Sequence, residues 1–137
     1  YPKDLKTRAL INARLDFDNG TLWPRQVAAF RPTFTGGKLT DEAVQTVKDS
    51  LSVVEEFLTR NKWIAGPKMT IADISYVSII ALLPFFQFDL SPFPKLRAWI
   101  DECNKVEVIK RLNEEGLANF KEILAQVQAA AAAAKTA

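Results

Sequence analysis

The residue types that most often do chemistry are scarce in this sequence. Histidine is absent, which removes the commonest general base and the commonest metal ligand. Cys103 is the single cysteine, so no internal disulfide can form and a zinc site is not expected. Lys105 lies close to Cys103 in sequence, but a reactive thiol needs a lowered pKa, and we interpret Cys103 as a structural residue. The sequence therefore predicts no metal site.

The strongest local pattern surrounds Thr70 and Asp73. The Thr70 hydroxyl can accept a hydrogen bond from the Asp73 N–H, and the Asp73 carboxylate can accept one from the Thr70 N–H. These are the two bonds of a capping box, and Met69 and Ile74 occupy the positions of a hydrophobic staple. We interpret Thr70 and Asp73 as a structural N-cap that begins a helix. Capping boxes are common, so this pattern alone identifies no function.

Apolar residues at three- and four-residue steps predict helices along most of the chain. The predicted helices span residues 2–31 (bent at Gly20 and Pro24), 40–61, 70–86 and 95–104, with one or two turns over 106–112 and a last helix from Leu117. The helix at 70–86 is apolar on nearly all sides, so other helices must surround it. The sequence thus predicts an all-α bundle of five to six helices over residues 1–128, then an alanine-rich tail, 129–137, that frays.

Composition excludes several classes of protein. The 18 basic and 16 acidic residues are interspersed along the 137-residue chain, so there is no basic stripe and we expect no nucleic-acid partner. The apolar runs are far shorter than the ~20 residues of a membrane-spanning helix, and we expect no membrane partner. The opening, Tyr1-Pro2-Lys3-Asp4, lacks the pattern of a secretory signal. A single cysteine fits a reducing compartment.

Three separated motifs carry a family resemblance. The segment Ala65-Gly66-Pro67-Lys68-Met69-Thr70-Ile71-Ala72-Asp73-Ile74-Ser75 resembles the core signature of the C-terminal domain of cytosolic glutathione transferases. Residues 1–22 resemble the insect delta and epsilon classes more narrowly, and Pro92-Phe93-Pro94-Lys95-Leu96 through Trp99 also matches in place. The resemblance covers nearly the whole chain, short of the alanine-rich tail.

The resemblance implies a fold, an activity and a division of labour. It implies a glutathione transferase C-terminal domain-like bundle, part of an enzyme that conjugates glutathione to hydrophobic electrophiles. In that family an N-terminal thioredoxin-like domain binds glutathione and, in the insect classes, supplies the catalytic serine. We expect that domain to be absent from this chain, so no catalytic residue is assigned and the chain alone should be inactive. The resemblance also implies a cytoplasmic homodimer, with glutathione as co-substrate and no other cofactor.

The resemblance also implies particular site residues. The substrate-binding positions would be Trp23, Gln26, Val27 and Phe30 of the bent first helix, and Leu117 and Phe120 of the last helix. For each of these residues the alternative is ordinary core packing.

Asp18 matches an acidic position that approaches the glutathione of the partner subunit across the dimer interface. The alternative for Asp18 is a surface acid that pairs with Arg14, four residues earlier, in a weak ion pair.

A second class of function stays open at this point. Transferase-like helical domains also occur in translation factors and synthetase-associated scaffolds, where they bind proteins without catalysis. The insect-class opening of the chain favours the enzyme over such an interaction module.

Overall fold

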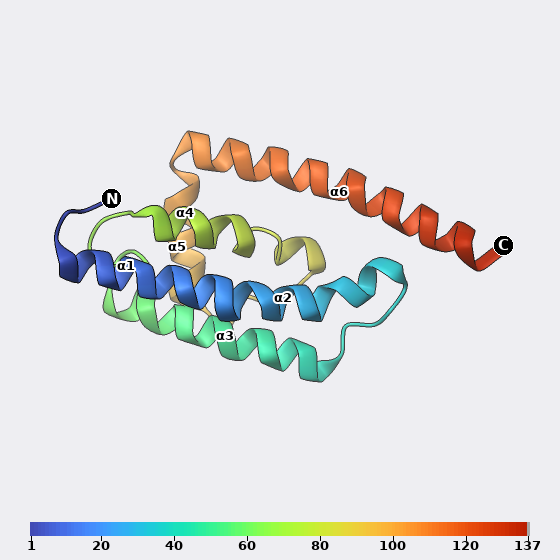
Figure 1. Ribbon diagram of the computed structural model, residues 1–137, viewed down its shortest axis with the longest axis horizontal. Helices are drawn as coiled ribbons and strands as arrows, with labels where there is room; N and C mark the ends of the chain where they lie inside the picture. The colour runs from blue at the N-terminus through green and yellow to red at the C-terminus, as the bar shows by residue number, and fades with distance from the viewer. Residues whose placement is uncertain (137) are drawn as a thin grey trace.

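The structure is a computed structural model that describes residues 1–136. A long, bent helical rod runs along it (Figure 1). The rod consists of α1 (Leu5–Phe17), a π-helical turn (Asp18–Leu22) and α2 (Trp23–Phe30). Pro24 has no N–H to offer the preceding turn, and the backbone widens there, so that the Trp23 N–H bonds to the Asp18 carbonyl. The predicted bent helix is therefore confirmed.

Helix α3 (Asp41–Arg60) runs antiparallel to this rod and packs against α2 (Figure 1). A 3₁₀ turn (Arg31–Thr35) ends the rod, and Gly36 supplies the left-handed φ of +87° that turns the chain back. The Thr40 hydroxyl caps α3 by accepting from the Ala43 N–H at 3.1 Å. The apolar stripe of α3 is buried, as the spacing predicts.

Helix α4 (Ile71–Ile80) is shorter than the 70–86 helix that the apolar run predicts. Pro84 has no N–H to donate to the Ile80 carbonyl. The Ile80 carbonyl accepts instead from the Leu83 N–H at 3.0 Å, and this bond between residues three apart replaces the α-helical pattern. A 3₁₀ turn, Pro84–Phe86, follows. Because α4 ends at Ile80, Phe86 lies off the α4 axis, in the 3₁₀ turn that follows.

Helix α5 (Pro94–Asn104) crosses the bundle between α3 and α6, close to the predicted 95–104. Its own N-cap, Phe93, provides no side-chain bond. Glu55 of α3 supplies the cap from a distance, because its two carboxylate oxygens accept from the N–H groups of Lys95 and Leu96, each at 2.8 Å.

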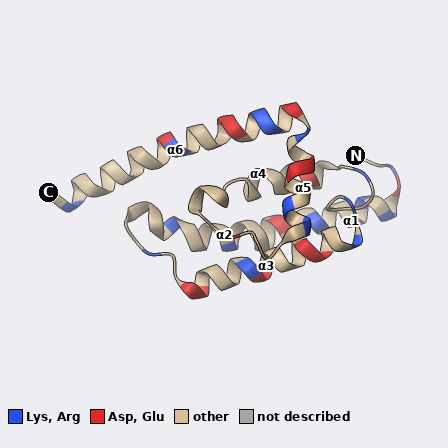
Figure 2. Cartoon of the chain, turned by 180° about the vertical axis from the view of Figure 1, so that it is seen from behind, with Lys and Arg blue, Asp and Glu red and all other residues tan. Residues whose placement is uncertain are grey.

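Helix α6 is one continuous helix, Glu107–Thr136, where the sequence predicts a short turn over 106–112 and a separate helix from Leu117. That prediction is wrong because Gly116 weakens a helix by only about 1 kcal/mol relative to Ala, which does not break it. Charged residues cluster on the first half of α6 and are sparse on the second (Figure 2). The alanine-rich segment is helical through Thr136, and residue 137 lies outside the described residues. The predicted fraying of this tail stays a prediction.

All regular structure in residues 1–136 is helical, so the predicted all-α bundle is confirmed. The one strand-like feature there is an isolated bridge between Trp63 and Gly66. Within the same residues, no helix is both long enough and apolar enough to cross a membrane.

Asp73 ties three segments together at the start of α4. Its Oδ2 accepts from the Thr70 N–H at 2.8 Å, which is the return bond of the capping box at this helix start. The Thr70 hydroxyl also accepts from the Ala72 N–H at 3.2 Å. The Asp73 Oδ1 accepts from the Ile64 N–H and from the indole Nε1–H of Trp99, both at 2.9 Å. The carboxylate is fully buried, and its bonds join α4 to the Trp63–Gly66 turn and to α5.

Asp18 is a second buried carboxylate, at the start of the π turn. Its Oδ2 accepts from the Ser75 hydroxyl of α4, and its Oδ1 has no hydrogen-bond partner among the described residues. Burial raises the pKa of the Asp18 carboxyl above its ordinary value of 3.8, and the Ser75 hydrogen bond opposes this less strongly. The contact ties the bend of the rod to α4.

Replacement of Asp73 by Ala should destabilise the fold by at least about 3 kcal/mol, because two buried donors and the half-buried Thr70 N–H lose their acceptor at once. Urea unfolding followed by circular dichroism measures this. The matched control is Asp101→Ala on the exposed face of α5, which should change the free energy of unfolding by less than about 0.5 kcal/mol. Equal midpoints for the two variants would contradict the role given to Asp73.

Replacement of Asp18 by Asn should flatten the pH dependence of stability. Because its pKa is raised in the native state, Asp18 stabilises the fold below pH 3.8, and this contribution is lost as pH rises through the native pKa. The free energy of unfolding of Asp18→Asn minus that of wild type should therefore be larger at pH 7 than at pH 3.5. Urea unfolding of both proteins at both pH values measures this difference. The exposed control Asp16→Asn should show no such gain, and an equal gain for both variants would contradict the prediction.

Candidate functional site

A cavity of about 300 Å³ lies between α2, the 3₁₀ turn that follows it, the end of α4 and α6. Aromatic rings dominate its lining: Phe30, Phe34, Phe86 and Phe120. Trp23, Val27 and Leu82 complete the apolar part, and Gln26 and Arg31 are its two polar members. Such a cavity favours flat apolar ligands because they leave water on binding.

The four phenylalanine rings form one connected cluster. Phe86 stacks on Phe30 with ring centroids 4.3 Å apart and planes 13° from parallel, and it stacks more loosely on Phe34 at 6.0 Å. Phe120 of α6 meets Phe34 and Phe86 edge to face, at 5.8 Å and 5.9 Å. Both geometries are favourable for aromatic pairs, so the same contacts that hold α6 in place also shape the cavity wall.

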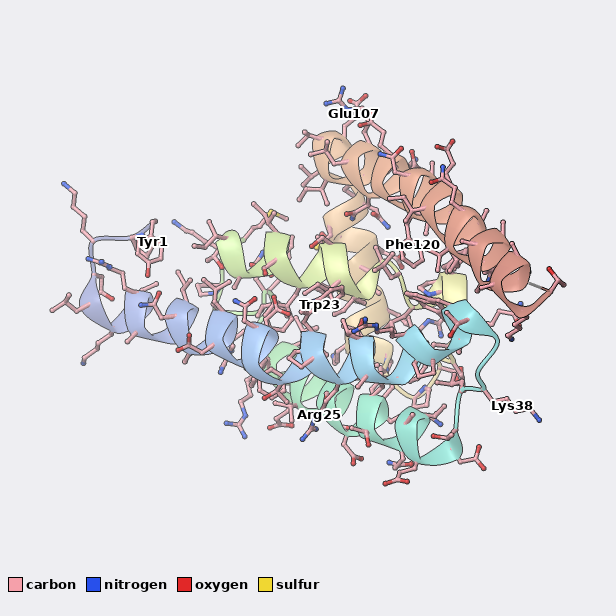
Figure 3. The ribbon with its side chains drawn as sticks, turned by 45° about the vertical axis from the view of Figure 1, so that its right-hand side comes forward. Tyr1, Trp23, Arg25, Lys38, Glu107 and Phe120 are labelled. Carbon is pink, nitrogen blue, oxygen red and sulfur yellow. The ribbon has the colours of Figure 1, made fainter. Side chains whose placement is uncertain are left out.

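Trp23 and Phe120 approach the cavity from different helices (Figure 3). Trp23 is 42% exposed, which places its ring at the cavity mouth. Arg25, two residues later, lies on the α3 side of α2, where its guanidinium donates to the Ser50 hydroxyl at 3.0 Å. Arg25 therefore faces away from the cavity.

The structure brings five of the six predicted substrate-binding residues to this one cavity: Trp23, Gln26, Val27, Phe30 and Phe120. Leu117 is the exception. It borders a neighbouring hollow of about 260 Å³ between α4 and α6, together with Ser78 and Leu112. Because Glu107–Thr136 is one helix, Leu117 lies nearly one turn before Phe120 and reaches the adjacent space.

Four lining residues were missed by the sequence reasoning: Arg31, Phe34, Leu82 and Phe86. Phe34 lies four residues after Phe30, a helical spacing that could have indicated it despite Pro32. Phe86 follows Pro84, and its position depends on how the chain turns there, which the apolar run did not reveal.

Asp18 is not a surface acid paired with Arg14. The Arg14 guanidinium lies over the Phe57 ring, 3.5 Å from its centroid, and its Nε donates to the Ile64 carbonyl at 3.1 Å. The Asp18 carboxylate is fully buried against Ser75, so within this chain it does not face solvent. Its predicted proximity to the glutathione of a partner subunit stays a prediction.

The cavity can bind, but its lining offers no nucleophile and no general base. Cys103 lies elsewhere, fully buried, and burial raises the pKa of its thiol to about 12, with Asp73 and Glu102 adding to the rise. Within residues 1–136, no three His, Cys, Asp or Glu side chains gather closely enough to hold a metal ion. The arrangement therefore suits substrate positioning rather than bond-making chemistry.

Comparison with known proteins agrees with this architecture. Residues 23–107 match the family described as "Glutathione S-transferase, C-terminal domain". Glutathione S-transferase D7 of Anopheles gambiae is 38% identical over 121 residues, which cover 85% of this chain and 55% of that protein. Its Drosophila melanogaster namesake is 37% identical over 131 residues, covering 95% of this chain and 58% of that protein.

Solved structures extend the likeness to the fold. A delta-class glutathione transferase from Nilaparvata lugens superposes with a TM-score of 0.85 at 32% identity, covering 93% of this chain and 61% of that one. An epsilon-class enzyme from the housefly, Musca domestica, gives 0.77 at 32% identity, covering 94% and 60%. This chain thus spans less than two thirds of the length of these relatives. By family match, identity and fold, the chain belongs to the glutathione S-transferase C-terminal domain family.

Proposed function

We propose that this chain forms the electrophile-binding and dimerisation part of a glutathione S-transferase that conjugates glutathione to hydrophobic electrophiles. The observation that carries the proposal is the aromatic cavity, because it joins α2 and α6 around an apolar space with no reactive group of its own. The relatives reported above are all called glutathione transferases, which favours the enzyme over a non-catalytic interaction module.

The proposed reaction divides its work between two units. The cavity removes the electrophile from water and holds it beside the thiol, which lowers the entropy cost of the encounter. The glutathione thiolate is bound and stabilised outside these 137 residues, in a thioredoxin-like domain of the kind that the longer relatives' class carries. Glutathione is then the co-substrate, and the reaction needs no further cofactor.

The proposal also includes a homodimer in the cytoplasm, with a role in detoxification. The buried, unpaired state of Cys103 is compatible with a reducing compartment. The family to which the chain belongs supports the dimer and the compartment as proposals, and the cavity described here lies within one chain.

The proposal is tested with glutathione and 1-chloro-2,4-dinitrobenzene. The 137-residue chain alone should give no turnover above buffer, whereas a fusion to the thioredoxin-like domain of the Nilaparvata lugens relative should conjugate the two. In that fusion, Phe120→Ala should lower kcat/KM for the electrophile about tenfold, because one wall of the cavity is lost. The KM for glutathione should stay within about twofold.

The matched control is Lys110→Ala, on the same helix but outside the cavity. It should retain wild-type kinetics for both substrates. Clear turnover by the chain alone would contradict the division of labour, and equal kinetics for Phe120→Ala and Lys110→Ala would contradict the cavity assignment.

A further inference from the structure

Gln26 is the anomaly in the cavity wall. Its side chain is 3% exposed, and its Nε2 is buried without a hydrogen-bond partner among the described residues. The neighbouring lining positions of α2, Trp23, Val27 and Phe30, are all apolar. A side chain that only filled the core at this position would be expected to be apolar too, because a buried unpaired amide is unfavourable.

The unsatisfied Gln26 Nε2 is a hydrogen-bond donor, and the charges around it indicate which kind of acceptor could bind there. An amide nitrogen carries two N–H donors, so its missing partner is an acceptor such as a carbonyl or nitro oxygen. Arg31, on the next turn, is the charged member of the lining, and the lining contains no carboxylate. The positive charge of Arg31 and the lack of a carboxylate in the lining both favour binding of a partly negative oxygen near Gln26 and Arg31.

We propose that Gln26 is a specificity-determining residue that donates a hydrogen bond to an acceptor oxygen on the electrophile. The favoured substrate class is then an aromatic compound whose ring carries a carbonyl or nitro oxygen. The four phenylalanine rings take the flat hydrocarbon part, and the Gln26 amide orients it. The inference rests on the proposed function, since it assumes that the electrophile occupies this cavity.

The orientation matters for the proposed conjugation because one polar anchor in an apolar space fixes how a flat ligand lies. A carbonyl or nitro group also withdraws electrons from the ring or the adjacent carbon, so the group that Gln26 binds is the one that activates the electrophile. A hydrogen bond to that oxygen stabilises the charge that it gains when the thiolate adds.

The test uses two unreactive ligands of similar size, acetophenone and isopropylbenzene, in which a carbonyl oxygen and a methyl group occupy corresponding positions. Both are titrated into the 137-residue protein by ¹H–¹⁵N NMR, with the Gln26 side-chain amide assigned by triple-resonance experiments on the wild-type protein. Acetophenone should move the Gln26 amide protons downfield, and isopropylbenzene should not. In Gln26→Leu, the Kd ratio of the two ligands should shift about two- to tenfold toward isopropylbenzene, the range of one net hydrogen bond.

The matched control is Gln126→Leu, the same substitution on the exposed surface of α6, which should keep the wild-type Kd ratio. If both ligands bind wild type and the ratio is unchanged in Gln26→Leu, the inference is overturned while the proposed cavity function stands. If neither ligand binds wild type, both are overturned. If Gln26→Leu does not fold, the amide shift in wild type decides alone: equal shifts with the two ligands overturn the inference.

Discussion

The buried carboxylate of Asp73 is the constraint on which the rest of the structure depends. Hydrogen bonds to a charged acceptor are stronger than neutral ones, and in a site closed to water each lost partner leaves an unsatisfied donor. Asp73 binds the start of its own helix, the Ile64 N–H and the Trp99 indole with one group. It thereby fixes where α4 begins relative to α5. The start of α4 in turn decides where its far end lies, and the turns that follow that end carry Leu82 and Phe86 to the cavity.

The cavity shows how one set of residues serves both stability and binding. Phe30, Phe86 and Phe120 pack against one another as a core would, yet they leave about 300 Å³ unfilled between α2 and α6. The space opens to solvent beside Trp23, and its lining is more apolar than that of the other hollows of the described residues. A space of this size with Trp23 at its mouth and an unpaired amide in its wall is better explained by binding than by packing alone.

The sequence predicted what depends on local spacing and failed where distant contacts decide. The capping box of Thr70 and Asp73 could be read because its members are three residues apart. The other two donors to Asp73 could not, since Ile64 and Trp99 lie nine and 26 residues away along the chain. The missing N–H of Pro24 predicts the bend there. Pro84 likewise cannot continue a helix, but the unbroken apolar run around it predicts a longer α4 than the one that ends at Ile80.

The candidate site divides in the same way. Trp23, Gln26, Val27 and Phe30 share one helix, and a single helical face brings them together. Arg31 and Phe34 follow in a 3₁₀ turn. The four-residue spacing from Phe30 is a signal for Phe34, whereas no apolar spacing indicates the exposed Arg31. Leu117 was misplaced because the chain from 107 onward was divided into two helices, and the face of each residue depends on that continuity.

The central claim is that a hydrophobic electrophile occupies the cavity between α2 and α6. Intermolecular nuclear Overhauser effects between 1-chloro-2,4-dinitrobenzene and the protein, without glutathione, test it most directly. An electrophile bound in this cavity should give contacts from its ring protons to Phe34, Phe86 and Phe120. Contacts confined to the hollow beside Leu117, or to the groove between α2 and α3 near Arg25, would contradict it.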